Sequence, residues 1–180
     1  MTTRLSHVSP VSSDHWRTAS SRAVHPSVSG EGDSLVAAVA EGLAAVTVRW
    51  ELADGESPDE RRHELLLSTD VYDAWLIHWP PGTGLVAHDH GGSGGALAVV
   101  AGTLDEDTLV DGQAVTTRMG PGESIRFGGG HIHAVMNRGD VSVTSVHVYS
   151  PPLRAMGYYR QDADGRLVVE RIDEVSVPER

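Results

Sequence analysis

Short apolar runs separated by turn residues dominate the chain from residue 65 onward. The runs are rich in Val, Ile, Leu and Thr, and Gly, Asp, Asn and Pro separate them. They cover residues 65–79, 96–104, 114–119, 123–127, 133–137, 142–150 and 166–172. Regular short strands with such turns, without alternating long helices, indicate an antiparallel sandwich or barrel. The predicted fold class is therefore all-β.

The segment before these runs has a different character. Residues 1–32 are rich in Ser, His and Pro without periodicity, which predicts an N-terminal arm. Residues 33–45 read DSLVAAVAEGLAA, with Asp33 and Ser34 as candidate N-caps, which predicts one helix to about Ala45. Because 180 residues suit one domain, we expect a single domain over residues 33–180.

Charge and cysteine content exclude several classes of function. The formal net charge is -11 and all 14 cationic side chains are Arg, so no basic stripe can neutralise nucleic acid or an anionic membrane. The chain has no Cys, so any metal must be bound by His or carboxylate. No stretch has the pattern of a signal peptide or a membrane span, and we expect a cytoplasmic protein.

Two histidine pairs carry the candidate chemistry. His88 and His90 lie in AHDHGG, and His131 and His133 lie in GGGHIHAVMN. Residues i and i+2 of a strand share a face, so a pair of imidazoles could point at one position inside a barrel. A histidine from another strand would complete three ligands. Three neutral imidazoles suit Fe, Zn, Cu or Ni, and a site with open positions is catalytic in type.

Two segments resemble the paired motifs of the cupin superfamily. The matching positions are Gly82-x5-His88-x-His90 with Gly102 further on, and Gly122-x5-Gly128-x-Gly130-xx-His133-xxx-Asn137, where Gly128 replaces the usual Pro. This resemblance implies a cupin (jelly-roll) β-barrel. It implies His88, His90 and His133 as metal ligands and leaves His131 outside the ligand set.

The first motif departs from the usual cupin pattern in one respect. A Glu normally follows the second His by four or five residues, but Gly94 and Gly95 stand there. A three-His site would keep the full 2+ charge of a divalent metal. That charge favours an anionic substrate ligand such as a thiolate.

Residues 60–160 resemble the bacterial cysteine dioxygenase-type cupins more specifically. The resemblance rests on WLIHWPPGTGLVAHDHGGSGGALAVVAGTL and, downstream, SVHVYSPP. It implies a mononuclear non-haem Fe(2+) enzyme that uses O2 to convert a small thiol to a sulfinate, with no organic cofactor. It also implies a monomer, because family members are often monomeric.

The downstream segment supplies further candidate residues. Ser145, His147 and Tyr149 fall at i, i+2 and i+4, and they match the family's Ser-His-Tyr chain beside the metal. The alternative is a core strand whose His and Tyr are satisfied by packing. The resemblance also makes Ser150-Pro151 the candidate for a cis peptide bond.

A cysteine substrate has a carboxylate, which Arg can bind with its planar fork. Arg62 is the candidate, because Arg62-His-Glu-Leu can be laid on the family's Arg-Asn-x-Leu segment; Arg61 stays open, and either could be a solvated surface charge. The family often has Tyr where Glu60 stands. Its animal members have Cys at the position of Gly95, so the thioether that they form to the active-site Tyr is excluded here.

The prediction from the resemblance is oxidation of L-cysteine to cysteine sulfinic acid. The first alternative is dioxygenation of 3-mercaptopropionate or another small thiol, whose enzymes often have Gln in place of the carboxylate Arg. A non-catalytic cupin that binds a metal or senses a ligand is the second alternative. It would need the three His but not the Ser145, His147 and Tyr149 chain.

Overall fold

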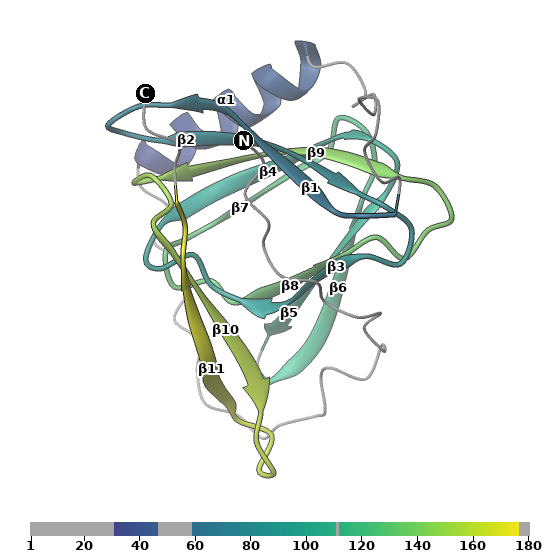
Figure 1. Ribbon diagram of the computed structural model, residues 1–180, viewed down its shortest axis with the longest axis vertical. Coiled ribbons are helices and arrows are strands. Elements are labelled where there is room, and N and C mark those ends of the chain that lie inside the picture. The colour runs from purple at the N-terminus through teal and green to yellow at the C-terminus, as the bar shows by residue number, and fades with distance from the viewer. Residues whose placement is uncertain (1–30, 47–58, 111, 177–180) are drawn as a thin grey trace.

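Eleven strands and one helix make up the described part of the chain. The computed structural model describes residues 31–46, 59–110 and 112–176 (Figure 1). In chain order the elements are α1 (Glu31–Val46), β1 (Arg62–Ser68), β2 (Asp73–Trp79), β3 (Gly84–His88), β4 (Gly94–Ala101), β5 (Leu104–Val110), β6 (Gln113–Met119), β7 (Ser124–Phe127), β8 (His133–Met136), β9 (Val143–Ser150), β10 (Ala155–Gln161) and β11 (Leu167–Glu174). Residues 1–30 of the predicted arm lie outside the described residues.

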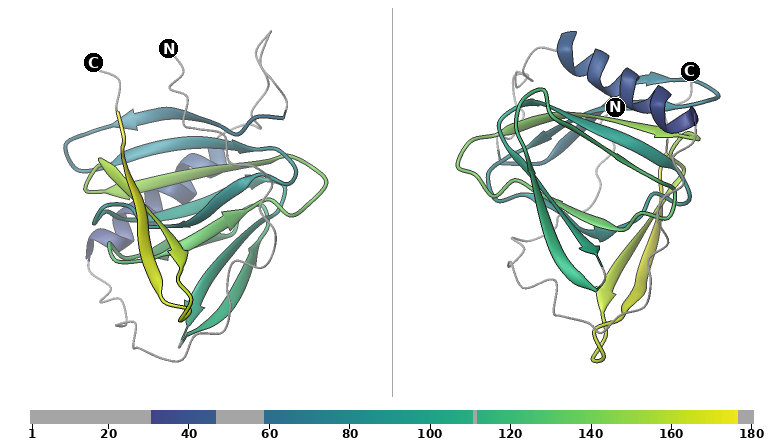
Figure 2. Two further views of the ribbon diagram at one scale, coloured as in Figure 1. Left: turned by 60° about the horizontal axis from the view of Figure 1, so that its bottom comes forward. Right: turned by 180° about the vertical axis from the view of Figure 1, so that it is seen from behind.

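The strands form two sheets that face each other (Figure 2). One sheet has the order β1-β2-β9-β4-β7 and the other β11-β10-β3-β8-β5-β6. All strand pairs are antiparallel, including the pairs of β2 with β9 and β3 with β8 that join segments far apart in sequence. The predicted all-β barrel is confirmed by these two antiparallel sheets.

Helix α1 covers the outer face of the five-stranded sheet (Figure 1). It contacts β4, β9 and β7. Small side chains on both sides let the helix approach the sheet closely, and burying their methyl groups stabilises the contact. The buried residues of this layer are Val36, Ala37, Ala40, Ala74, Leu76, Ala96, Ala98, Val146 and Val148. No helix in the described part of the chain is long and apolar enough to cross a membrane.

Strand β9 is buried on both of its faces, which explains its unbroken run of buried residues. Val146 and Val148 pack beneath α1. The alternate residues Ser145, His147 and Tyr149 therefore face the interior between the sheets, since side chains of a strand alternate. Strand β2 follows the same rule. Its aromatic residues lie in the interior core, and Leu76 lies under the helix.

Gly95 makes room for an aromatic ring beside the interior histidines. It lies directly opposite Tyr149 across the β4 and β9 pair. A Cβ at this position would lie 2.4 Å from the carbonyl oxygen of Val148 and 2.7 Å from the Phe127 ring. The Phe127 ring in turn stacks on His90 at 4.8 Å. Only Gly therefore lets the strand and this ring lie so close.

We expect Gly95→Ala to lower the free energy of unfolding by about 1–3 kcal/mol, the usual cost of overpacking a well-packed interior. Gly130→Ala is the matched control, because nothing lies within 4 Å of a Cβ built there. Urea unfolding of the three proteins measures the difference. Equal stability of Gly95→Ala and the unsubstituted protein would contradict the packing described.

Candidate metal centre and its surroundings

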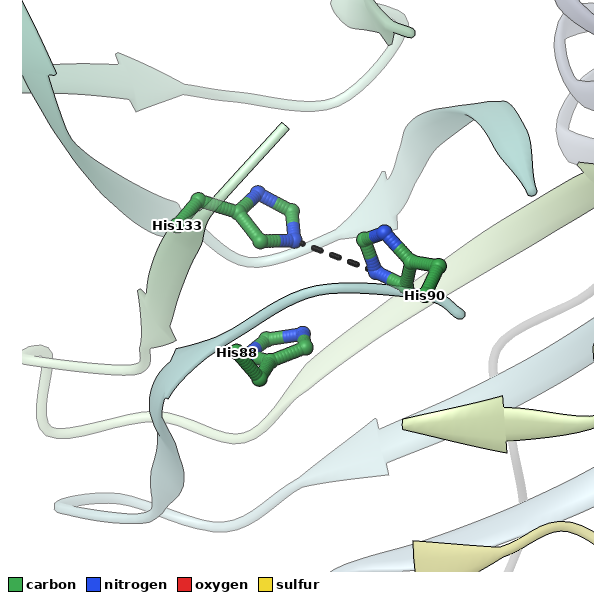
Figure 3. Close-up of side chains that lie close together, drawn as sticks. All are labelled: His88, His90 and His133. Atoms are coloured by element: carbon green, nitrogen blue, oxygen red, sulfur yellow. Dashed lines mark hydrogen bonds between the residues drawn. The ribbon is translucent and has the colours of Figure 1, made fainter. Parts of the chain in front are cut away.

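Three imidazoles converge between the sheets (Figure 3). His88 ends β3, His133 begins β8, and the two are cross-strand neighbours. His90 follows in the turn after β3. The ring centroids lie 4.7 Å apart for His88 and His133, 5.0 Å for His90 and His133, and 5.1 Å for His88 and His90. The Nε2 atoms of His90 and His133 are 3.3 Å apart.

The hydrogen bonds of the rings leave nitrogen lone pairs facing one another. His88 Nδ1 lies 2.8 Å from the carbonyl oxygen of Val86, and His133 Nδ1 lies 2.7 Å from Glu106 Oε1. Each Nδ1 is therefore the protonated donor, and each Nε2 carries the lone pair. Burial lowers the pKa of all three imidazoles below its ordinary value, so they are neutral at pH 7. This donor set fits a divalent transition metal.

Asp89, between two of these histidines, holds the segment in place. Its side chain points away from the interior and accepts hydrogen bonds from the backbone N–H groups of Gly91 at 2.9 Å and Gly157 at 3.1 Å. The hydroxyl of Tyr159 also donates to it. These bonds tie the turn after β3 to β10. His88 is the last residue of β3 and His90 lies beyond it, so the two imidazoles converge without the i, i+2 strand geometry considered from the sequence.

Glu106 is a functional candidate that the sequence does not reveal. It lies in β5, where Asp105 and Asp107 face outward to Arg118 and Arg138. Glu106 faces inward and accepts hydrogen bonds from His131 and His133. Burial alone would raise the pKa of Glu106. The hydrogen bonds from the two histidines have the opposite and larger combined effect, and they lower the pKa to about 2. If LDEDTLV is taken as a strand, side-chain alternation places Glu106 on the opposite face from Asp105 and Asp107. Three consecutive acidic residues do not look like a strand, so this signal is easily missed.

Ser145, His147 and Tyr149 form one hydrogen-bonded chain. Trp79 Nε1 lies 2.8 Å from Ser145 Oγ, which lies 3.0 Å from His147 Nε2, and His147 Nδ1 lies 3.2 Å from Tyr149 Oη. The Tyr149 ring lies 5.0 Å from that of His90. This chain therefore reaches the three converging histidines.

The order of donors along this chain depends on the tautomer of His147. Trp79 N–H can only donate, so Ser145 Oγ accepts from it, and Ser145 can then either donate to His147 Nε2 or accept a second hydrogen bond from it. In the tautomer with Nδ1 protonated, His147 donates to Tyr149, whose hydroxyl proton is free to point elsewhere. Burial lowers the pKa of His147 to about 3 and raises that of Tyr149, so both are neutral at pH 7.

The two adjacent arginines lie on opposite faces of the sheet. Arg62 pairs in register with His78, which lies on the outward side of β2 next to the inward Trp79. Arg61 lies on the inner side, with its guanidinium 4.6 Å from the centre of the Trp79 ring. Its charge lowers the pKa of His147, after the larger effect of burial. Arg62 is itself buried, but on the outward side of the sheet, so Arg61 and not the Arg62 favoured by the sequence faces the interior between the sheets.

The remaining sequence candidates also have definite places. The peptide bond between Ser150 and Pro151 is cis, which confirms that expectation. Glu60 is exposed. The ring centroid of Tyr158, in β10, lies 6.1 Å from that of His88.

Several solved structures are similar to this one. A conserved protein with a double-stranded β-helix domain from Klebsiella pneumoniae is 18% identical, with 66% of this chain and 88% of that chain covered and a TM-score of 0.46. A sugar phosphate isomerase of the cupin superfamily from Silicibacter pomeroyi is 24% identical, with 62% and 76% covered and a TM-score of 0.46. The cupin domain of Schizosaccharomyces pombe Cnp3 is 13% identical, with 50% and 60% covered and a TM-score of 0.46. No curated protein matches the sequence.

Two opposed antiparallel sheets around converging histidines define a cupin-type β-barrel. Within that class, residues 33–162 match the family described as cysteine dioxygenase type I. The match spans most of the chain, and the chain belongs to this family. Membership supports a thiol dioxygenase or another cupin-type metal enzyme.

Proposed function

We propose that the protein holds one Fe(2+) through His88, His90 and His133 and oxidises L-cysteine with O2 to cysteine sulfinic acid. The observation that carries the proposal is the convergence of three neutral imidazoles, all buried, in a member of this family. Bound Fe(2+) supplies a redox-active centre at which a thiolate and O2 can react. In the overall reaction the sulfur gains two oxygen atoms and gives four electrons to O2, so no other reductant is needed.

Arg61 is proposed to bind the substrate carboxylate in place of Arg62. Its guanidinium carbon lies 4.6 Å from the centre of the Trp79 ring, a cation–π contact that holds the side chain on the inner face of the sheet. The Nε atom of Arg61 is buried and has no hydrogen-bond partner among the described residues. A carboxylate would provide the missing acceptor and neutralise the buried charge.

Tyr149 is proposed to donate its hydroxyl proton to the reacting sulfur or oxygen. In the tautomer with Nδ1 protonated, His147 donates to one lone pair of the Tyr149 oxygen, and Ser145, which accepts from Trp79, donates to His147 Nε2. Because the Tyr149 pKa is raised by burial, the hydroxyl keeps its proton throughout the physiological range. Its role is then to donate a hydrogen bond that stabilises developing negative charge, and not to act as a phenolate base.

The same arrangement fits 3-mercaptopropionate as a second candidate substrate. This compound has the thiol and the carboxylate of cysteine but lacks its amino group. Glu60 stands where the family often has Tyr, and its side chain is exposed. An arginine that binds the carboxylate would accept either acid. Turnover rates measured in parallel with cysteine and 3-mercaptopropionate show which one is the preferred substrate.

We expect Tyr149→Phe to form sulfinate roughly 100-fold more slowly while keeping its iron, because one preorganised donor beside the reacting atoms is lost. Tyr72→Phe is the matched control, since Tyr72 packs in the layer beneath α1. Sulfinate is measured by mass spectrometry with equal iron loading in each protein. Turnover of Tyr149→Phe at the unsubstituted rate would contradict the assigned role.

A further inference from the structure

A buried carboxylate supports one of the three converging histidines from behind. Oε1 of Glu106 lies 2.7 Å from Nδ1 of His133 and 2.9 Å from Nε2 of His131. Glu106 is 6% exposed and His133 is 1% exposed. Among the described residues, both hydrogen bonds to this carboxylate come from imidazoles.

Strand alternation explains why Glu106 reaches this position. Glu106 pairs in register with Val135 of β8, and Thr108 pairs with His133. Val135 belongs to the interior core, so Glu106 shares its face and lies diagonally across from His133. The neighbouring Asp107 faces outward instead, toward Arg138 and Thr116.

Burying a carboxylate costs free energy unless it is paired or hydrogen-bonded. The outward aspartates of β5 pair with arginines, whereas the described hydrogen-bond partners of Glu106 are two histidines. The three converging histidines also differ in their support. His88 Nδ1 faces a backbone carbonyl oxygen, and His90 Nδ1 has no hydrogen-bond partner among the described residues. His133 alone of the three is held by a carboxylate in the described structure.

We propose that Glu106 is a positioning residue for His133 as a metal ligand, and that His131 fixes the carboxylate of Glu106. The bond to Nδ1 sets the tautomer and turns Nε2 of His133 toward the other two imidazoles. It also places one negative charge behind the ligands, in a site where Gly94 and Gly95 stand in place of the usual cupin Glu. The inference rests on the metal site of the proposed function and deepens it.

Glu106→Gln tests the proposal, with Asp107→Asn as the matched control. Both substitutions remove one carboxylate from β5 and keep the side-chain size, but only the first removes it from His133. We expect Glu106→Gln to bind Co(II) about 10- to 100-fold more weakly in a competition titration. Asp107→Asn should bind within about twofold of the unsubstituted protein, because its carboxylate contacts no ligand.

Two further measurements separate positioning from a loss of stability. The reduction potential of the iron-loaded protein should rise in Glu106→Gln and stay unchanged in Asp107→Asn, because the charge on His133 favours the oxidised metal. His131→Ala tests the same hydrogen-bonded group by removing the partner of Glu106 that is more exposed than His133. It should keep one Co(II) per chain with an affinity between those of the unsubstituted protein and Glu106→Gln, and it decides the matter if Glu106→Gln does not fold.

Several results would overturn the inference. Equal affinity of Glu106→Gln and the unsubstituted protein would leave Glu106 without a role toward the metal. An equal loss in Asp107→Asn would show a general effect of charge or stability. Two Co(II) per chain, with one lost in His131→Ala, would make Glu106 and His131 ligands of a second ion. Failure of the unsubstituted protein to bind Co(II) would defeat the proposed function itself, and the inference with it.

Discussion

His88→Ala is expected to abolish stoichiometric iron binding. The imidazole of His88 is buried, faces those of His90 and His133, and has its Nδ1 occupied by a backbone carbonyl oxygen. Removing it leaves two imidazoles for a metal that would otherwise have three. Iron content after anaerobic loading and desalting measures the loss directly.

Thermal unfolding gives a second measurement of the same prediction. A ligand that binds only the folded state at about 100 times its Kd stabilises that state by about 2.7 kcal/mol. The unsubstituted protein should therefore unfold at a higher temperature with Fe(2+), and His88→Ala should show no such shift. His131→Ala should keep one iron per chain, because Nε2 of His131 contacts Glu106 Oε1 and His131 is not one of the three converging histidines. Full iron retention by His88→Ala would defeat the ligand assignment.

Arg61→Ala is expected to raise the Michaelis constant for cysteine by roughly 30- to 700-fold, which corresponds to about 2–4 kcal/mol for a buried, charged hydrogen-bonded pair. Cysteamine has the thiol and amine of cysteine but no carboxylate. Its Michaelis constant should therefore change little. Initial rates of O2 uptake over a range of each thiol give both constants.

Arg62→Ala provides a matched control one residue away. Arg62 lies opposite His78 on the outward face, whereas Arg61 lies over Trp79 on the inner face. We expect Arg62→Ala to leave the discrimination between cysteine and cysteamine unchanged, whatever it does to stability. The carboxylate site lies elsewhere if Arg62→Ala alone reproduces the selective loss, or if Arg61→Ala affects both thiols equally.

The strand and turn pattern predicts the fold class and misses particular strands. The predicted helix over 33–45 corresponds to α1, which begins two residues earlier and ends one residue later. Strand β5 is missed because three of its seven residues are acidic, and acidic residues are rare in strands. Contacts with Arg118 and Arg138 from other parts of the chain make this strand possible. Such long-range pairing is invisible in a local pattern.

Strands β3 and β10 are missed for a related reason. Each carries a Gly that a local reading treats as a break: Gly84 in β3 and Gly157 in β10. In the structure, both glycines have close neighbours, and the approach is much tighter at Gly84 than at Gly157. A Cβ at Gly84 would lie 2.4 Å from the carbonyl oxygen of Val135, and one at Gly157 would lie 3.0 Å from Asp89 Oδ1.

The site divides into parts that spacing predicts and parts that depend on register. The motif spacing singles out His88, His90 and His133, which the structure brings together; that they bind iron stays a prediction. The choice between Arg61 and Arg62 depends on which face each presents. That face follows from the pairing of β1 with β2, which no local motif specifies.

Oxygen consumption by the anaerobically Fe(2+)-loaded protein tests the central claim most directly. Cysteine, 3-mercaptopropionate and cysteamine are supplied in parallel, and the products are identified by mass spectrometry. We predict that cysteine is preferred and that one O2 is consumed for each cysteine sulfinic acid formed. Preference for 3-mercaptopropionate would support the assignment as a thiol dioxygenase but change the proposed substrate. Bound iron with no O2 uptake with any of these thiols would contradict the account.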